Sequence, residues 1–413
     1  MRNVFIWLIL FFLFVFLPGG LPAVEFGLVV NQSADAGNSE SKDSLFEYNA
    51  LIVPRVFLLL GDGAEGSPMG SVFASAGMTL GYADNFTYIP ELLRTELALQ
   101  LRGLEMQLGR FGYSAPVSFL AEGLLDGIQL SHGSSLGRFK AGAWYTGFLY
   151  KKNINLTMTE YDRSVNEHPV DYNHFANTYF APPKALASLE WEHFAIADIL
   201  RVNIAASALF DLAEGLTEGQ KRYNSQYLSI RGGLPVNNFF FELGGIFSID
   251  LTESSTLTPA LAGSLGVYWT VPGSFGSRLS FNMRYAGGHS NELSAFIPIT
   301  TIHAGDIVEA KMSALTVLDL NYLARFTEKF GTSISARYFI RNDTVTFNTF
   351  PIMEEGEGGK MLGAEAFARL TFSPLSDLQF SLGGGAFLPS LGNNWKDEKP
   401  VWLLTASVIL AVF

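Results

Sequence analysis

Apolar and polar residues alternate along most of this chain, and this alternation limits its possible folds more than any other feature. From Leu279 to Arg284, for example, every second residue is apolar and the residues between them are polar or charged. A period of two places successive side chains on opposite faces of a β-strand. We therefore expect a sheet with one apolar face and one polar face.

The alternating segments predict about eighteen strands, with about 14 or 16 as alternative counts. They lie at 24–30, 45–59, 69–83, 91–102, 104–112, 125–132, 138–150, 184–194, 199–211, 222–231, 238–250, 257–271, 278–286, 310–326, 331–341, 361–372, 378–387 and 401–413. Short turns alternate with long connections, and the long ones lie at 31–44, 151–183, 288–309, 342–360 and 388–399. This alternation is typical of an antiparallel up-and-down barrel.

The composition indicates where the apolar face lies. Hydrophobic residues make up 48% of the chain and charged residues only 16%, against a usual charged fraction of about 25%. After residue 23 no apolar run approaches the roughly 18 residues of a membrane-spanning helix. A closed barrel can expose apolar side chains to lipid while its strands satisfy every backbone polar group. We predict an all-β transmembrane barrel, with residues 24–413 as a single domain surrounded by outer-membrane lipid.

The first 23 residues have the features of a removable export signal. Arg2 provides the positive start, residues 4–17 are apolar, and the segment ends at Ala23 after Leu21 and Pro22. The chain has no cysteine, so neither disulfides nor a lipid-modified cysteine is expected. An exported barrel belongs in the outer membrane of a diderm bacterium. The short turns, and with an even strand count both termini, are then expected in the periplasm.

Charged residues of the alternating segments are expected to face the barrel lumen. The candidate pore-lining residues are Arg94, Glu96, Arg138, Lys140, Arg201, Arg284, Asp319, Arg325, Arg337, Arg341, Glu365 and Arg369. Cations outnumber anions in this set, although the net charge of the chain is −12. A basic lumen would favour anions, because a narrow channel focuses the field of its lining charges. Pairing of these charges across strands, which would only hold the barrel in shape, is an equally open alternative.

Two stretches resemble a known family. Residues 99–111 contain Leu108-Gly109-Arg110, and residues 124–130 contain Asp126-Gly127. This pair of segments is similar to a hairpin of the alginate-export-type and related substrate-specific outer-membrane porins. The resemblance implies a barrel of about eighteen strands with a pore loop near 113–124. The last strand, which ends on Phe413, similarly resembles the signal that the barrel-assembly machinery recognises.

These features predict a channel for diffusion of small hydrophilic solutes. One alternative is a surface adhesin or structural barrel that binds through the aromatic segment 151–183. A second alternative is a transporter of hydrophobic compounds, although the roughly 20 residues before the second strand leave no room for a plug domain. No spacing predicts a catalytic site, a cofactor or a metal site, and no basic aromatic surface predicts nucleic-acid binding.

Overall fold

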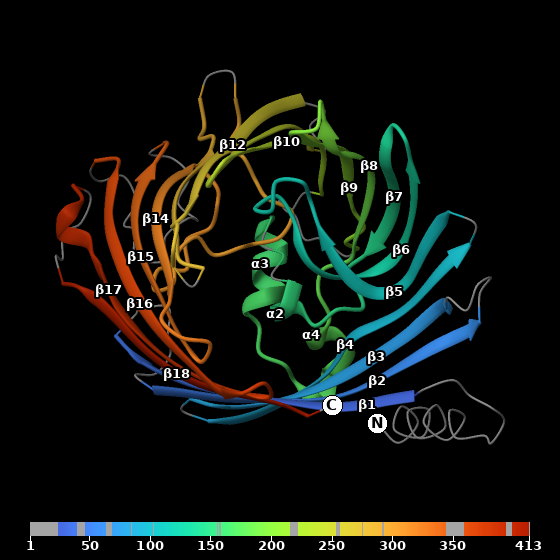
Figure 1. Ribbon diagram of the computed structural model, residues 1–413, viewed down its shortest axis with the longest axis horizontal. Coiled ribbons are helices and arrows are strands. Elements are labelled where there is room, and N and C mark those ends of the chain that lie inside the picture. Colours follow the sequence, from blue (N-terminus) through green and yellow to red (C-terminus); the bar gives the residue numbers. More distant parts are fainter. Residues whose placement is uncertain are drawn as a thin grey trace.

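The computed structural model describes residues 24–38, 46–62, 68–83, 85–101, 103–154, 156, 158–214, 222–252, 257–274, 276–290, 293–343, 359–393 and 399–412. Within these residues the chain forms one antiparallel sheet of 18 strands, which closes on itself as a barrel (Figure 1). The predicted fold class and strand count are confirmed. The predicted export signal and Phe413 lie outside the described residues.

The strands follow one another around the barrel in chain order. Their bounds are β1 (Val24–Gly37), β2 (Phe46–Asp62), β3 (Pro68–Tyr82), β4 (Phe86–Leu101), β5 (Leu104–Ser114), β6 (Glu122–Ser134), β7 (Gly137–Tyr145), β8 (Lys184–Ile196), β9 (Leu200–Asp211), β10 (Tyr223–Val236), β11 (Phe239–Thr252), β12 (Leu257–Thr270), β13 (Arg278–Ala286), β14 (Leu315–Arg325), β15 (Phe330–Arg341), β16 (Met361–Leu375), β17 (Leu378–Leu388) and β18 (Val401–Val412). The barrel closes between β1 and β18, where Leu28 is opposite Val412 and Gly37 is opposite Leu403.

Several strand ends differ from the sequence-based expectation. Residues 31–37 continue β1 instead of starting a loop, because their backbones pair with both β2 and β18. The segment 232–236 likewise stays in β10, where it pairs with β11. Strand β7 ends at Tyr145, and β14 begins only at Leu315. In these last two places, apolar residues that the sequence suggested for strands belong to segments that fold into the barrel.

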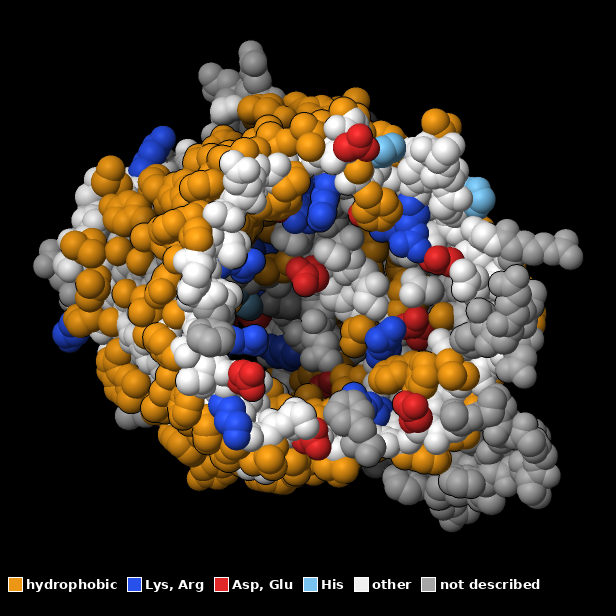
Figure 2. All heavy atoms as spheres, in the orientation of Figure 1, with side chains coloured by type: hydrophobic (Ala, Val, Ile, Leu, Met, Phe, Trp, Pro, Cys, Tyr) orange, Lys and Arg blue, Asp and Glu red, His pale blue; other side chains and the backbone are white. Residues whose placement is uncertain are grey.

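The two faces of the sheet have opposite chemistry. Figure 2 shows hydrophobic side chains covering the outer wall, while Lys, Arg, Asp and Glu side chains gather around the central opening. Outward-facing Leu243 and Leu320 are 65% and 49% exposed. Polar partners such as Asp319 and Arg337 are paired on the opposite face. None of the helices among the described residues is long and apolar enough to cross a membrane.

Candidate functional site

Three chain segments fold from one end of the barrel into its lumen. The first is the tip of the β5–β6 hairpin, residues 111–125, which we call the tongue. The second, residues 146–183, carries α2 (Lys151–Ile154), α3 (Glu160–Glu167), η2 (Tyr172–His174) and α4 (Phe175–Tyr179), and its helices lie inside the ring of strands (Figure 1). The third is the β13–β14 connection, residues 287–314. All three leave from the end that we call the loop end; the opposite end is the turn end.

Two glycines mark the place where the tongue leaves the wall. Gly109 of β5 is opposite Gly127 of β6. Gly109 has a φ of +106°, and a Cβ there would lie 2.2 Å from the carbonyl oxygen of Thr95. A Cβ on Gly127 would lie 2.3 Å from the carbonyl oxygen of Ala143. Only glycine therefore fits both positions. Beyond the neighbouring Arg110 and Asp126, the hairpin pairs with neither β4 nor β7.

The residues beside these glycines fix the bend. Arg110 donates to the carboxylate of Asp126 through Nε and Nη2, at 2.8 and 2.7 Å. The same guanidinium donates to the carbonyl oxygens of Leu92 on β4 and Phe148 on the second segment. Arg110 is 6% exposed. The Gly-Arg and Asp-Gly pairs of the sequence thus form a fixed bend that its own ion pair stabilises.

The tongue packs across the lumen against the third segment. Leu120 is fully buried, and its carbonyl oxygen accepts from the backbone N–H of Ile299 at 2.8 Å. The hydroxyl of Thr300 bonds the backbone of Glu122. The rings of Phe119 and Phe296 meet edge to face at 6.1 Å. The segment near 113–124, where the family resemblance implied a pore loop, therefore folds into the lumen and is held there by hydrogen bonds and by apolar packing.

The second segment is attached to the wall by a buried cation. The Nζ of Lys184, the first residue of β8, lies 3.1 Å from Asp162 of α3 and 3.0 Å from Asp211 of β9. The side chains of Lys184 and Asp162 are fully buried, and that of Asp211 is 2% exposed. Asp162 also forms a capping box with Thr159. A buried cation shared by two carboxylates fixes geometry strongly, because losing the lysine would leave two buried carboxylates without their countercharge.

The third segment is attached to the opposite wall by a carboxylate. Glu365 of β16 accepts the backbone N–H groups of Asp306, Ile307 and Val308 at 2.8 to 3.0 Å. Arg337 of β15 lies between Glu365, at 2.7 Å, and the carboxylate of Asp306. The Nε of Arg337 is also 3.6 Å from Asp319 of β14. Segment 304–308 is thus held by wall residues that the sequence suggested for the pore lining.

The predicted pore-lining residues divide into two groups. In the first group each side chain has a protein partner. Its ion pairs join Arg94 to Glu96, Arg138 to Glu105, Lys140 to Glu190 and Glu192, and Arg337 to Asp319, Asp306 and Glu365. Arg284 donates to the carbonyl oxygen of Ala304 at 3.0 Å. Arg341 is only 4% exposed.

The second group consists of Arg201, Arg325 and Arg369, and Arg278 of β13 has the same character. All four are exposed. Arg278 lies over the ring of Tyr268, and Arg369 lies over the ring of Phe367. Among the ion pairs of the described residues, none includes any of these four arginines. They belong to the strand halves nearer the turn end, so part of the accessible positive charge of the lumen lies there.

Burial lowers the pKa of a lysine in the third segment. Lys311, in the third segment, forms an isolated bridge with His303. Burial, reinforced by the nearby charge of Arg163 in α3, lowers the pKa of Lys311 to about 8. Sequence periodicity could not find this residue, because it lies in an irregular segment whose position depends on tertiary contacts.

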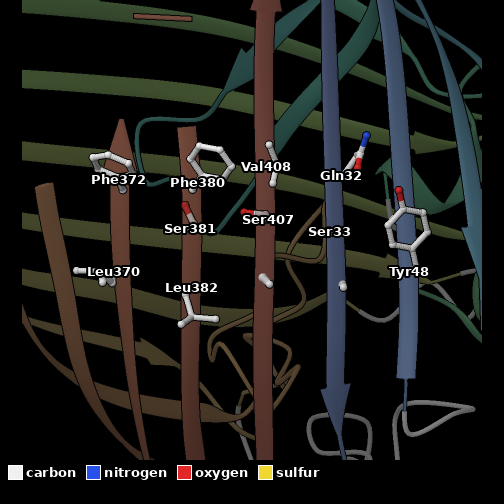
Figure 3. Close-up of a pocket in the computed structure, with 12 residues that line it drawn as sticks. Gln32, Ser33, Tyr48, Leu370, Phe372, Phe380, Ser381, Leu382, Ser407 and Val408 are labelled. Carbon is white, nitrogen blue, oxygen red and sulfur yellow. The ribbon is translucent and has the colours of Figure 1, made fainter. Parts of the chain in front are cut away.

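Other surface features do not belong to the lumen. An open hollow of about 400 Å³ lies on the outer wall over β16, β17, β18, β1 and β2. Figure 3 shows apolar side chains such as Phe372, Phe380 and Val408 along it. Lipid would cover this surface in a membrane. Among the described residues, no group of three or more His, Asp or Glu side chains is arranged to hold a metal ion.

No protein-family model and no curated protein matches the chain. Solved structures are similar over nearly its whole length. OccK2 (OpdF) of Pseudomonas aeruginosa has a TM-score of 0.60 at 9% identity, covering 96% of this chain and 99% of that one. OpdQ of the same organism has a TM-score of 0.58 at 12% identity, covering 95% and 98%. OccK11 (OpdR) has a TM-score of 0.57 at 11% identity, covering 94% and 96%. The chain therefore has the fold of the substrate-specific outer-membrane porins of Pseudomonas.

Proposed function

We propose that this protein is an outer-membrane channel through which small hydrophilic solutes diffuse. The observation that carries the proposal is a closed barrel with an apolar outer wall and a charged lumen that three in-folded segments narrow (Figures 1 and 2). An 18-stranded barrel is wide enough for an aqueous lumen. The fold of solved outer-membrane proteins such as OpdK supports the same interpretation. Residues 1–23 would be removed on export, and the barrel-assembly machinery would recognise the strand that ends on Phe413.

The distribution of connections supports an orientation. The segments that enter the lumen all leave from the loop end, while the connections at the turn end include the very short β4–β5 and β16–β17 turns. In bacterial barrels the short turns lie in the periplasm. We propose that the turn end is periplasmic, so that β1 begins and β18 ends on that side.

The accessible arginines support a preference for anions. Anionic solutes would be attracted by the exposed Arg201, Arg278, Arg325 and Arg369. By contrast, Arg284 bonds a backbone carbonyl oxygen, Arg337 is ion-paired and Arg341 is buried. A structure of OccK2 contains glucuronate, a small carboxylate. Glucuronate is therefore a suitable first probe for this channel.

The segment 151–183 favours a channel over an adhesin. An adhesin needs an outward binding surface, but Tyr179 of this segment is buried and Asp162 is attached to the wall inside the barrel. The segment is placed to narrow a passage.

Reconstitution in planar bilayers tests the proposal. We expect discrete conductance steps and a reversal potential, in a salt gradient, that indicates anion preference. Replacing Arg201, Arg278, Arg325 and Arg369 with Gln should shift the reversal potential toward cations. The shift should shrink at high salt, because the screening length falls from about 10 Å at 0.1 M to about 3 Å at 1 M. A correctly folded barrel without conductance would contradict the channel function.

A further inference from the structure

The barrel wall is incomplete at the loop end of β4. The ladder between β4 and β5 covers only Thr95 to Leu101, whereas β4 continues to Phe86 and pairs there with β3. A register shift lies at the same point, between Leu92 and Thr95. Because the tongue has turned into the lumen, the residues 86–94 present an edge that has no second strand among the described residues. An unpaired edge at membrane depth is costly unless its polar groups are satisfied.

Side chains satisfy the carbonyl oxygens of this edge in place of a strand. The hydroxyl of Tyr172 donates to the carbonyl oxygen of Tyr88, and the hydroxyl of Tyr179 donates to that of Pro90 at 2.8 Å. Arg110 donates to the carbonyl oxygen of Leu92. The three acceptors are spaced two residues apart, as the acceptors of one strand edge are. Three side chains thus donate to the carbonyl oxygens that lack β5 as a partner.

Aromatic rings fill the opening beside these bonds. The ring of Tyr172 stacks on that of Tyr88, with centroids 4.7 Å apart. Tyr88 is 46% exposed on the outer face, whereas Tyr172 belongs to the segment that folds inside the barrel. Phe175 and Tyr179 continue the stack at 4.4 Å, and Phe180 meets Tyr179 edge to face. This aromatic stack therefore runs from the lumen to the outer surface of the wall.

We give the name seam to the gap in the wall beside residues 86–94 of β4, which Tyr172, Tyr179 and Arg110 close. We propose that this seam is a lateral portal through which small, hydrophobic, ring-bearing molecules pass between the lumen and the membrane. Side-chain bonds can release one at a time, while a backbone ladder opens only cooperatively. The outward neighbour Leu92 is 49% exposed and apolar, so an opening here would face lipid. On the inner side, the carboxylate of Glu91 accepts a hydrogen bond from the side-chain amide of Asn153, with Nδ2 and Oε2 2.6 Å apart. This pair gives the lumen side of the seam a polar border. The aromatic stack offers ring faces on which such a molecule can stack.

A reversible crosslink tests the portal. The chain has no cysteine, so Tyr88→Cys with Tyr172→Cys introduces a single thiol pair across the seam. Leu97→Cys with Leu108→Cys is the matched control, because these residues are opposite each other where the β4–β5 ladder is intact. The readout is uptake of the hydrophobic dye phenylnaphthylamine by intact cells, compared with single-channel conductance of each purified protein. Heat-modifiable gel mobility confirms that each variant has folded.

We expect oxidation of the seam pair to reduce dye uptake to the level of cells without the protein, and reductant to restore it. Conductance should not change, and the control pair should affect neither quantity. Unchanged dye uptake after oxidation, or a parallel loss of uptake and conductance, would overturn the portal. Dye uptake without any ionic conductance would retain the portal while contradicting the hydrophilic channel.

A second variant tests the seam without a crosslink. Tyr172→Phe with Tyr179→Phe keeps both rings but removes two of the three bonds to the β4 edge. Each lost hydrogen bond should favour the open seam by about fivefold, so dye uptake should rise while conductance stays the same. Tyr338→Phe, which removes a hydroxyl bond to Leu391 elsewhere on the wall, is the control. Equal uptake by the double variant and the unaltered protein would also overturn the proposal.

Discussion

Arg110 and Asp126 are opposite each other on β5 and β6 and form a two-point ion pair where the hairpin leaves the barrel wall. The pair lies one residue beyond Gly109 on β5 and one residue before Gly127 on β6. It therefore holds the tongue at the place where both strands bend. The same arginine reaches β4 and the second in-folded segment, so one side chain links the constriction to the wall.

Loss of this arginine should destabilise the protein and widen the channel. Arg110→Ala leaves Asp126 without its partner, and breaking a mostly buried pair costs about 3–5 kcal/mol. Arg138→Ala is the control, because its pair with Glu105 is 34% and 47% exposed and such pairs contribute at most about 1 kcal/mol. Thermal unfolding and single-channel conductance measure the two effects. Equal effects of both substitutions would show that Arg110 does not hold the tongue.

Glu365 should control the position of the third segment. Glu365→Gln removes the charge opposite Arg337 and weakens the acceptor of three backbone N–H groups. We expect larger and noisier conductance steps, because segment 304–308 loses its attachment. Glu242→Gln, which breaks a pair with the exposed Arg231, should leave the step size unchanged. Identical current records from Glu365→Gln and the unaltered protein would contradict the attachment.

Lys311 should make selectivity depend on pH. With a pKa of about 8, this lysine is charged at neutral pH and loses its proton as the pH rises through that value. Anion preference should therefore decrease between about pH 7 and pH 9. At every pH, Lys311→Met should show the weak anion preference that the unaltered protein reaches only at high pH. Reversal potentials measured across this range test this expectation. A slope that survives in Lys311→Met would assign the effect to another group.

The same lysine predicts how stability changes with pH. Its folded pKa is below the unfolded value of about 10.4, so the unfolded chain binds more protons between these values. Resistance to unfolding should then increase as the pH rises from about 8 toward 10. Thermal unfolding of Lys311→Met should lack this increase.

The face assignment predicts a contrast between neighbours on β4. Leu99 is opposite Met106 on the lipid face, while Gln100 is opposite Glu105 on the lumen face. Leu99→Arg should impair assembly by roughly 2–4 kcal/mol if it lies near the bilayer midplane, whereas Gln100→Arg should be tolerated. The fraction of heat-modifiable barrel in membrane extracts measures assembly. The reverse order would mean that the register is shifted by one residue.

Sequence periodicity was sufficient for the wall of the barrel and insufficient for its interior. The alternation around Leu279 to Arg284 predicts both strand and face, because a strand between lipid and water must alternate. Apolar and polar residues also alternate in the tongue, yet its apolar side chains pack inside the barrel against Phe296. No local sequence pattern distinguishes packing inside the barrel from exposure to lipid. Periodicity also places Arg337 and Glu365 on the inner face. Their partners in segment 304–308 depend on the path of a connection that has no periodic signal.

The portal residues illustrate the same limit. Tyr172 and Tyr179 suggested an outward binding surface in the sequence, because aromatic residues in a long loop are typical of one. Their hydroxyls instead bond the edge of β4, which is more than 80 residues earlier in the chain. Only the departure of β5 from the wall creates that edge.

The closure of the barrel has a consequence for how the protein is made. The barrel closes where β1 pairs with β18, with Val29 opposite Ala411. These two strands can pair only after the whole chain has been synthesised. Until then each is a long apolar edge that could join another chain, and contacts this distant in sequence form slowly. We expect the unfolded protein to need a holding chaperone on its way to the membrane, and a chain truncated before β18 to aggregate rather than insert.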